Sequence, residues 1–196
     1  RIAACRGAAG SFGAVQVLVV QGAGHDRLAR RLGDAVVDQV SRSPNQVNHI
    51  DLVTDGFVPW MNGDERAAYL TDAPLIDPRT AGYADALRAA DVLVVVDRPS
   101  FGNLSPLLKG WIEKVFVPGV AFVLNPRTQR VRPGLHHLRR IVGIGVGTEC
   151  SPAARDTVMR TMWMCTSLRT RAHWIEATPG ADDLAERTVR WRADNL

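Results

Sequence analysis

The chain has 196 residues, and its 46% hydrophobic and 22% charged content is typical of one globular α/β domain rather than a disordered chain. The formal net charge of +4 comes almost entirely from arginine, since Lys109 and Lys114 are the only lysines. These arginines form no long run and do not alternate with aromatic residues, which argues against nucleic-acid binding.

Cysteine usage and hydropathy indicate the compartment. Cys5, Cys150 and Cys165 form no closely spaced pair and leave an odd thiol, so a reducing cytoplasm is expected. No His/Cys cluster has metal-ligand spacing, and no apolar run reaches the ~18 residues of a membrane span. We expect residues 1–13 to form a flexible arm before a single domain at 14–196, with no metal and no membrane contact.

The first half of the chain alternates between strand and helix periods. Strands are expected at residues 14–20, 46–53 and 91–97, and helices from about His25 and at 80–90. The third strand is a continuous apolar run, which predicts burial on both faces. Residues 54–78 form a long, partly helical excursion. In the first helix one apolar stripe is predicted from Leu28, Leu32, Ala35, Val36 and Val40.

The second half continues the alternation. Ser105 is a good helix N-cap and Pro106 suits the first helical position, so a helix is expected there. Residues 119–124 and the basic turn after them indicate a hairpin or an excursion. The remaining predicted elements are a strand at 139–147, a helix at 151–168, a strand at 169–177 and a closing helix at 181–196.

Five strands that are each followed by a helix predict a parallel sheet with right-handed crossovers and helices on both faces. We therefore expect a flavodoxin-like three-layer sandwich with strand order 2-1-3-4-5. Ligands of such folds sit beyond the carboxyl ends of the strands around the switch point. The loops there are residues 21–26, 98–105 and 146–150, and all contain glycine.

The loop at 98–105 carries one aromatic ring, Phe101, among small residues whose backbone amides we expect to be uncovered. Such a turn suits a flat heteroaromatic ring with carbonyl groups, such as an isoalloxazine, because amides bond its edge while Phe101 flanks its face. A plain strand-to-helix connection with Phe101 as a core plug explains the same residues. The residues alone leave both interpretations open.

The stretch YADALRAADVLVVVDRPSFGNLSPLLKGWIEKVFVPGVAFVL, residues 83–124, resembles the flavodoxin-fold NAD(P)H:quinone oxidoreductases. Upstream of it, DLVTDGFVPWMNGDERAAYL at residues 51–70 resembles the family's DLY-x-x-GF-x-P stretch and the acidic helix that follows that stretch. The likeness covers roughly residues 46–124, and LKGWIEKVF at 108–116 is its most specific part.

The resemblance implies a homodimeric flavoprotein that passes two electrons from NAD(P)H through FAD, or alternatively FMN, to a quinone-like acceptor. In the excursion, Phe57, Trp60 and Met61 are candidate walls of the acceptor pocket, and packing within the chain explains the same residues equally well. By position in the motifs, the cofactor would be held by Gly22, Gly24, His25, Asp26, Pro99, Ser100, Phe101, Gly102, Asn103, Leu104, Gly145, Val146, Gly147 and Thr148.

The chain departs from the family pattern in its first loop, which is about three residues shorter. Asp26 stands near an asparagine position, where its carboxylate competes with phosphate for a helix N-terminus. Glu149 and Cys150 replace the side chains that assist hydride transfer in some members. The alternative hypothesis is therefore a flavin-free relative that acts as a binding or interaction subunit.

Two further residues have competing interpretations. Trp111 is interpreted as a core or dimer-interface residue, and its apolar helix, together with the excursion, underlies the expected homodimer. Cys150 precedes a helix N-terminus, which would lower its thiol pKa, but no partner base is evident for a nucleophile.

Overall fold

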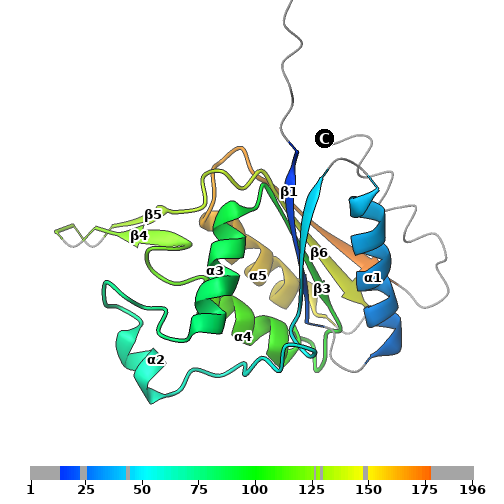
Figure 1. The fold of residues 1–196 in the computed structure, drawn as a ribbon, viewed down its shortest axis with the longest axis horizontal. Coiled ribbons are helices and arrows are strands. Elements are labelled where there is room, and N and C mark those ends of the chain that lie inside the picture. The colour runs from blue at the N-terminus through cyan, green and yellow to red at the C-terminus, as the bar shows by residue number, and fades with distance from the viewer. Residues whose placement is uncertain are drawn as a thin grey trace, which may run out of the picture.

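A computed structural model of the protein describes residues 14–22, 26–42, 45–125, 127–128, 130–147 and 150–177. Five parallel strands form one sheet in the order β2-β1-β3-β6-β7 (Figure 1). Their bounds are β1 Gln16–Gln21, β2 Gln46–Asp51, β3 Val92–Asp97, β6 Arg140–Val146 and β7 Arg171–Ala177. Within this sheet the order is the predicted 2-1-3-4-5, so the flavodoxin-like topology is confirmed.

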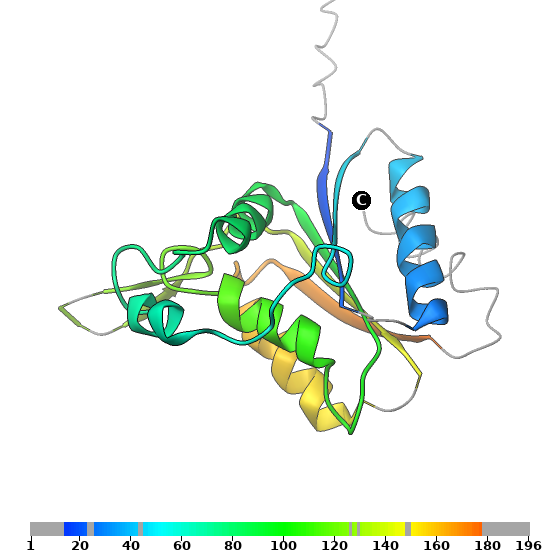
Figure 2. The ribbon, with the colours of Figure 1, turned by 60° about the horizontal axis from the view of Figure 1, so that its bottom comes forward.

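Helices cover both faces of the sheet. Helix α1 lies on one face, and α3, α4 and α5 lie on the other (Figures 1 and 2). The helix bounds are α1 Arg27–Ser41, α2 Gly63–Ala68, α3 Pro78–Ala89, α4 Pro106–Val115 and α5 Pro152–Met164. The predicted arm at 1–13 and closing helix at 181–196 lie outside the described residues.

Strand β3 is central and every one of its residues is buried, as its continuous apolar run predicts. The predicted hairpin or excursion after α4 is an antiparallel hairpin of β4 Phe122–Leu124 and β5 Val131–Pro133. It projects from the side of the domain away from α1 (Figure 1). Ser105 caps α4 through its side chain, and Pro106 opens the helix, both as predicted.

The apolar stripe of α1 differs from the prediction at one end. Ala29, Leu32 and Val36 are buried against the sheet, whereas Leu28 is exposed. The buried Gln21 side chain explains the rotation, because its amide nitrogen donates to the carbonyls of Ala29 and Arg30 at 3.3 and 3.2 Å. A polar anchor at the end of β1 therefore sets which face of α1 meets the sheet.

The excursion after β2, residues 52–77, is held against α4 by close packing. A Cβ atom on Gly110 would lie 2.1 Å from the carbonyl oxygen of Pro59, so only glycine permits this approach. Phe57 is buried and meets Tyr83 of α3 edge to face at 5.9 Å between ring centroids. The glycine of the motif LKGW thus has a packing role within the chain.

A buried ion pair completes this attachment. The ammonium of Lys114 lies 2.6 Å from Glu65 Oε1, 3.4 Å from the Val58 carbonyl oxygen and 5.5 Å from the centre of the Phe57 ring. The other carboxylate oxygen of Glu65 accepts a hydrogen bond from Asn62 N at 2.8 Å, in the capping box of α2. Both charges are therefore compensated by groups that the excursion and α4 bring together.

Lys114→Met should lower the free energy of unfolding by about 3–5 kcal/mol, because Glu65 would remain buried and charged without its partner. Lys114→Met/Glu65→Gln should recover part of that loss, since glutamine keeps the cap without the charge. Urea denaturation measures both variants. Lys109→Met is the matched control, because Lys109 pairs with Glu113 on the exposed face of the same helix and should matter little. Equal losses for the two lysines would contradict the assigned role.

Candidate functional site

The loops that follow β1, β3 and β6 meet at one edge of the sheet, because these three parallel strands are neighbours. Gly22 N donates to the Val96 carbonyl at 2.8 Å, and Ser105 Oγ donates to the Gly22 carbonyl at 3.0 Å. A Cβ atom on Gly22 would lie 2.7 Å from Leu108 Cβ. The first loop therefore leaves the sheet in direct contact with the start of α4.

The loop after β3 forms a two-residue hairpin turn. Ser100 and Asn103 exchange backbone hydrogen bonds of 2.9 and 3.0 Å, and Phe101 and Gly102 between them have φ values of +50° and +75°. Two successive positive φ angles are the type I′ geometry, which glycine and asparagine favour. Phe101 holds this conformation with its whole side chain exposed. The interpretation of Phe101 as a core plug is therefore wrong.

Several described backbone amides of these loops donate within the chain, which differs from the expectation that the amides are uncovered. Besides Ser100 and Asn103, Leu104 N donates to the Asn103 side chain and Ser105 N to Asp97 Oδ2. Gly147, with φ of +89°, donates its amide to the Ala177 carbonyl at 2.8 Å. The sequence shows that these loop residues are small. It does not show which hydrogen-bond acceptors lie beside their amides in the folded chain.

The third loop adjoins the second. Gly102 forms an isolated parallel bridge with Cys150, and its carbonyl accepts from Ser151 N at 3.1 Å. Gly145 sits beneath the indole of Trp174, because a Cβ atom there would lie 2.5 Å from the ring. Gly145 is one of the predicted cofactor residues, and the Trp174 side chain of β7 covers the position where its side chain would be.

The structure also bears on the predicted thiol pKa of Cys150 and on the remaining predicted cofactor residues. Burial raises the pKa of the Cys150 thiol, and the nearby Asp97 raises it further, so the expected lowering is wrong. Gly24, His25 and Thr148 lie outside the described residues. Pro99 and Val146 are both buried, Val146 within β6.

An acidic side chain of the chain itself occupies the N-terminus of α1. Asp26 Oδ1 accepts a hydrogen bond from Ala29 N at 2.8 Å, and its Oδ2 lies 3.6 Å from an Arg98 guanidinium nitrogen. Gly147 lies beside the same guanidinium, since its Cβ position is 3.6 Å from the Arg98 Cζ. The place where a helix N-terminus would receive a phosphate is therefore filled by a carboxylate with its own cation.

A second carboxylate is buried at the end of β3. Asp97 has no exposed surface, and burial raises its pKa to about 6, although Oδ2 accepts from Ser105 N at 2.8 Å. Its other oxygen, Oδ1, has no hydrogen-bond partner in the described part of the chain. The sequence signals this burial only through the position of Asp97 at the carboxyl end of an apolar strand.

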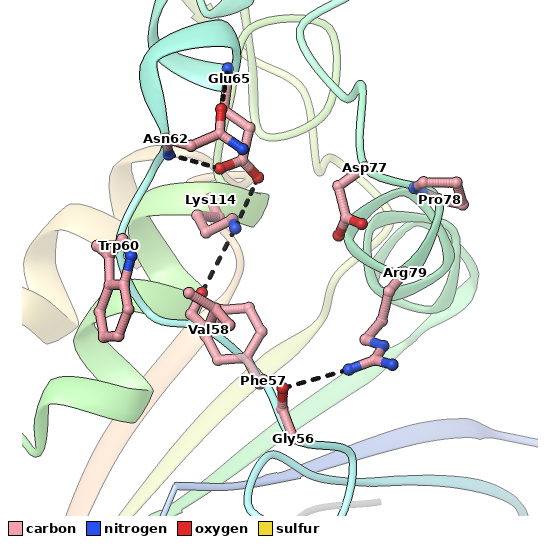
Figure 3. Close-up of a pocket in the computed structure, with 10 residues that line it drawn as sticks. All are labelled: Gly56, Phe57, Val58, Trp60, Asn62, Glu65, Asp77, Pro78, Arg79 and Lys114. Atoms are coloured by element: carbon pink, nitrogen blue, oxygen red, sulfur yellow. Dashed lines mark hydrogen bonds and ion pairs between the residues drawn. The ribbon is translucent and has the colours of Figure 1, made fainter.

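A cavity of about 510 Å³ lies between the excursion, the start of α3 and the end of α4. Phe57 and Trp60, two of the predicted acceptor-pocket residues, line it, whereas Met61 lines a much smaller hollow next to it. Figure 3 shows Trp60 and Asn62 on one side of the cavity and Asp77, Pro78 and Arg79 on the other. Whether these walls contact an acceptor stays a prediction.

The cavity and the three loops lie at different ends of α4. The loops adjoin Pro106, and the cavity adjoins Lys114, eight residues later in the same helix. A rise of 1.5 Å per residue separates these two positions by ~12 Å. The predicted cofactor residues and the predicted acceptor walls are therefore not brought together within one chain.

The described residues fit a flavin only in part. Phe101 offers an exposed aromatic face beside the switch point, which suits an isoalloxazine ring. The described phosphate end does not fit as it stands, because the Asp26 carboxylate takes an amide of the helix N-terminus. Binding a phosphate there requires the Asp26–Arg98 pair to separate.

The described ranges contain neither a membrane-spanning helix nor a cluster of metal-binding side chains. No helix there combines the length and apolar character that crossing a bilayer requires. His, Cys, Asp and Glu side chains there form no group of three or more that could hold a metal ion.

Comparison with known proteins gives a family match and structural likenesses. The family model described as "Flavodoxin-like fold" matches residues 15–179. A search of curated proteins finds no match.

Three solved structures illustrate the shared fold. An NAD(P)H:quinone oxidoreductase from Methanothermobacter marburgensis is 15% identical with a TM-score of 0.68, over 92% of this chain and 96% of its own. A putative quinone reductase from Klebsiella pneumoniae is 14% identical with a TM-score of 0.72, over 93% and 85%. An FMN-dependent NADH-azoreductase from Bacillus anthracis, in complex with FMN, is 14% identical with a TM-score of 0.66, over 89% and 98%.

The buried Asp97 should make stability depend on pH. Its pKa of about 6 in the folded state exceeds the ~3.9 of an unfolded aspartate, so the folded state binds more protons between these values. The contribution of Asp97 to the free energy of unfolding is therefore fully present below about pH 4, and it is lost as the pH rises through about 6. The gain in unfolding free energy from Asp97→Asn should grow by about 1–3 kcal/mol between pH 4 and pH 8.

Chemical denaturation at several pH values measures this gain. Asp34→Asn, which removes an exposed carboxylate from α1, controls for the general change in net charge. Parallel pH profiles for the parent protein and Asp97→Asn would contradict the prediction.

Proposed function

The chain belongs to the Flavodoxin-like fold family, and from this premise we propose that it is a flavin-dependent oxidoreductase. It transfers two electrons from NAD(P)H to a quinone-like acceptor, with azo compounds and nitroaromatics as further acceptors. Names of similar folds support this class, since they include an NAD(P)H:quinone oxidoreductase and an NADH-azoreductase.

The observation that carries the proposal is the exposed Phe101 ring at the switch point of the sheet. The ring sits on a type I′ turn that Ser100 and Asn103 close, and Gly102 joins this turn to the third loop. A hydrogen-bonded turn fixes the backbone of Phe101, and its exposed ring offers a face on which a flat molecule can stack. In a flavin enzyme this face would fix the flavin ring against which donor and acceptor bind in turn.

A bound flavin would supply the hydride chemistry, and the chain's own residues would bind and orient it. Phe101 would flank the isoalloxazine face, and residues 99–104 would lie along its edge. Arg98 is the described cation that would meet a phosphate, because it already pairs with Asp26 at the N-terminus of α1. The resemblance-based assignments at Gly24, His25 and Thr148 stay predictions.

The identity of the flavin is part of the proposal. The sequence interpretation prefers FAD, because its adenine half would offset a weak phosphate site. One similar structure is described as a complex with FMN, which favours the mononucleotide instead. Titration with each flavin distinguishes them.

Assembly and acceptor contacts are also proposed. Trp111 is fully buried in the core, so α4 does not present its tryptophan face to a partner as the dimer argument assumed. The excursion does expose Val58, Trp60, Leu70 and Ile76. These residues support a homodimer in which one chain's excursion approaches the other chain's loops, a distance that a single chain does not close.

One observation favours the second candidate function, a flavin-free binding subunit. The Asp26–Arg98 pair occupies the phosphate position, and the described loop amides of Gly22, Ser100, Asn103 and Gly147 all donate within the chain. A chain whose site is satisfied in this way folds without a cofactor.

Flavin uptake separates the two functions. The purified protein is titrated with FMN and with FAD while flavin fluorescence is followed, and NADPH and then a quinone are added to the mixture. The proposed enzyme binds a flavin whose visible absorbance bleaches with NADPH and recovers with the quinone. Phe101→Ala should weaken flavin binding about tenfold through the loss of ring contact.

Asp26→Asn should tighten flavin binding about tenfold or more. Asparagine caps a helix as well as aspartate does, but it removes the negative charge that faces the phosphate and pairs with Arg98. Asp77→Asn is the matched control, because Asp77 caps α3 in the same way far from the three loops. If only Asp26→Asn binds flavin, or if neither protein does, the natural chain is the flavin-free subunit.

A further inference from the structure

We propose that the cavity between the excursion, α3 and α4 is a binding site for a flat, uncharged aromatic molecule that carries a carbonyl oxygen. Within one chain this site lies at the other end of α4 from the flavin loops, and testing it does not require the proposed enzyme activity. Its volume of about 510 Å³ falls within the range of small-molecule pockets in proteins.

The charges on the floor of the cavity are already compensated. Lys114 and Glu65 form a buried ion pair at 2.6 Å, and the Val58 carbonyl and the Asn62 amide engage the same two side chains. A charged ligand would lose its hydration on entering the cavity, and neither Lys114 nor Glu65 is left to form a new ion pair with it. The floor therefore favours an uncharged ligand.

The rim of the cavity also disfavours a carboxylate ligand. Asp77 points its carboxylate toward the space in Figure 3, and a hydrogen bond from the Thr80 side chain is the first cause that lowers the pKa of Asp77, so this group stays ionised. Arg79 lies on the same side of the cavity as Asp77 in Figure 3, and its guanidinium donates to the backbone carbonyls of Asp55 and Gly56. The four charged side chains of the cavity thus sum to zero.

Aromatic and apolar walls favour a flat ring. Trp60 lines the cavity and yet is 68% exposed, and Val58 beside it is 46% exposed. An exposed indole in a small pocket offers a face for stacking, and covering it removes apolar surface from water. The buried ring of Phe57 lies below, held by Lys114 and Tyr83.

One hydrogen-bond donor selects for a carbonyl group. Asn62 Oδ1 accepts from Glu65 N at 2.9 Å, whereas its side-chain nitrogen Nδ2 donates to no described residue. The capping box fixes this side chain, so the donor is oriented before a ligand arrives. A ligand carbonyl would satisfy it at little cost in entropy.

Two probes of equal size test the proposal. 1-Naphthamide is uncharged and carries a carbonyl, whereas 1-naphthoate has the same rings with a negative charge. Ligand-observed NMR titration of the flavin-free protein should give a Kd of roughly 0.1–1 mM for the amide, a value normal for so small a molecule. The naphthoate should bind at least tenfold more weakly.

Variants locate the site. Trp60→Ala should weaken naphthamide binding about tenfold, and Trp60→Phe should retain most of it. Asn62→Ser keeps a helix cap but removes Nδ2, so it should weaken naphthamide binding several-fold. Phe101→Ala should leave naphthamide binding unchanged, because Phe101 belongs to the loop after β3 and does not line the cavity.

The proposal is overturned if the parent protein does not bind naphthamide, if naphthoate binds equally well, or if Trp60→Ala has no effect. Loss of naphthamide binding in Phe101→Ala alone would place the probe at the flavin loops and also overturn it. Because these readouts need no flavin, failure of the proposed enzyme activity would leave them intact.

Discussion

The buried ammonium of Lys114 is the constraint on which the outer half of this domain depends. A charge with so little access to water is tolerated only where oxygen atoms surround it, and Glu65 and the Val58 carbonyl supply them. Both belong to the excursion between β2 and α3. That segment therefore packs closely against α4. Gly110 permits this packing because it has no side chain that would meet Pro59. The cavity lies next to this anchor, between the excursion and the start of α3.

Much of the fold follows from periodicity alone. Alternating strand and helix segments, the continuous apolar run of β3, and the Ser-Pro starts of α4 and α5 predict the elements and their order. What periodicity misses is set by polar contacts between distant residues. Gln21 rotates α1 so that Ala29, not Leu28, faces the sheet, and no pattern within α1 signals that contact.

The site was less predictable than the fold for a physical reason. Small residues in loops mark where amides are sterically accessible, but hydrogen bonds at 100–105 and Gly147 depend on which acceptors the folded chain supplies. The motif LKGWIEKVF identified the family, yet Gly110, Trp111 and Lys114 serve packing and charge compensation inside the chain. A specific sequence motif can thus mark a packing contact between two segments of the chain and not a ligand-binding site.

Phe101 has a consequence for how the sequence can drift over evolutionary time. A bulky residue in the left-handed region costs roughly 1–2 kcal/mol, and glycine or asparagine at this place would remove most of that cost. Its ring buries nothing in return, because it is fully exposed. Random substitution under selection for folding alone would erode the aromatic side chain at this turn. Contacts within the described fold therefore give no reason for an aromatic side chain at this turn, whereas stacking by a flat molecule from outside would give one.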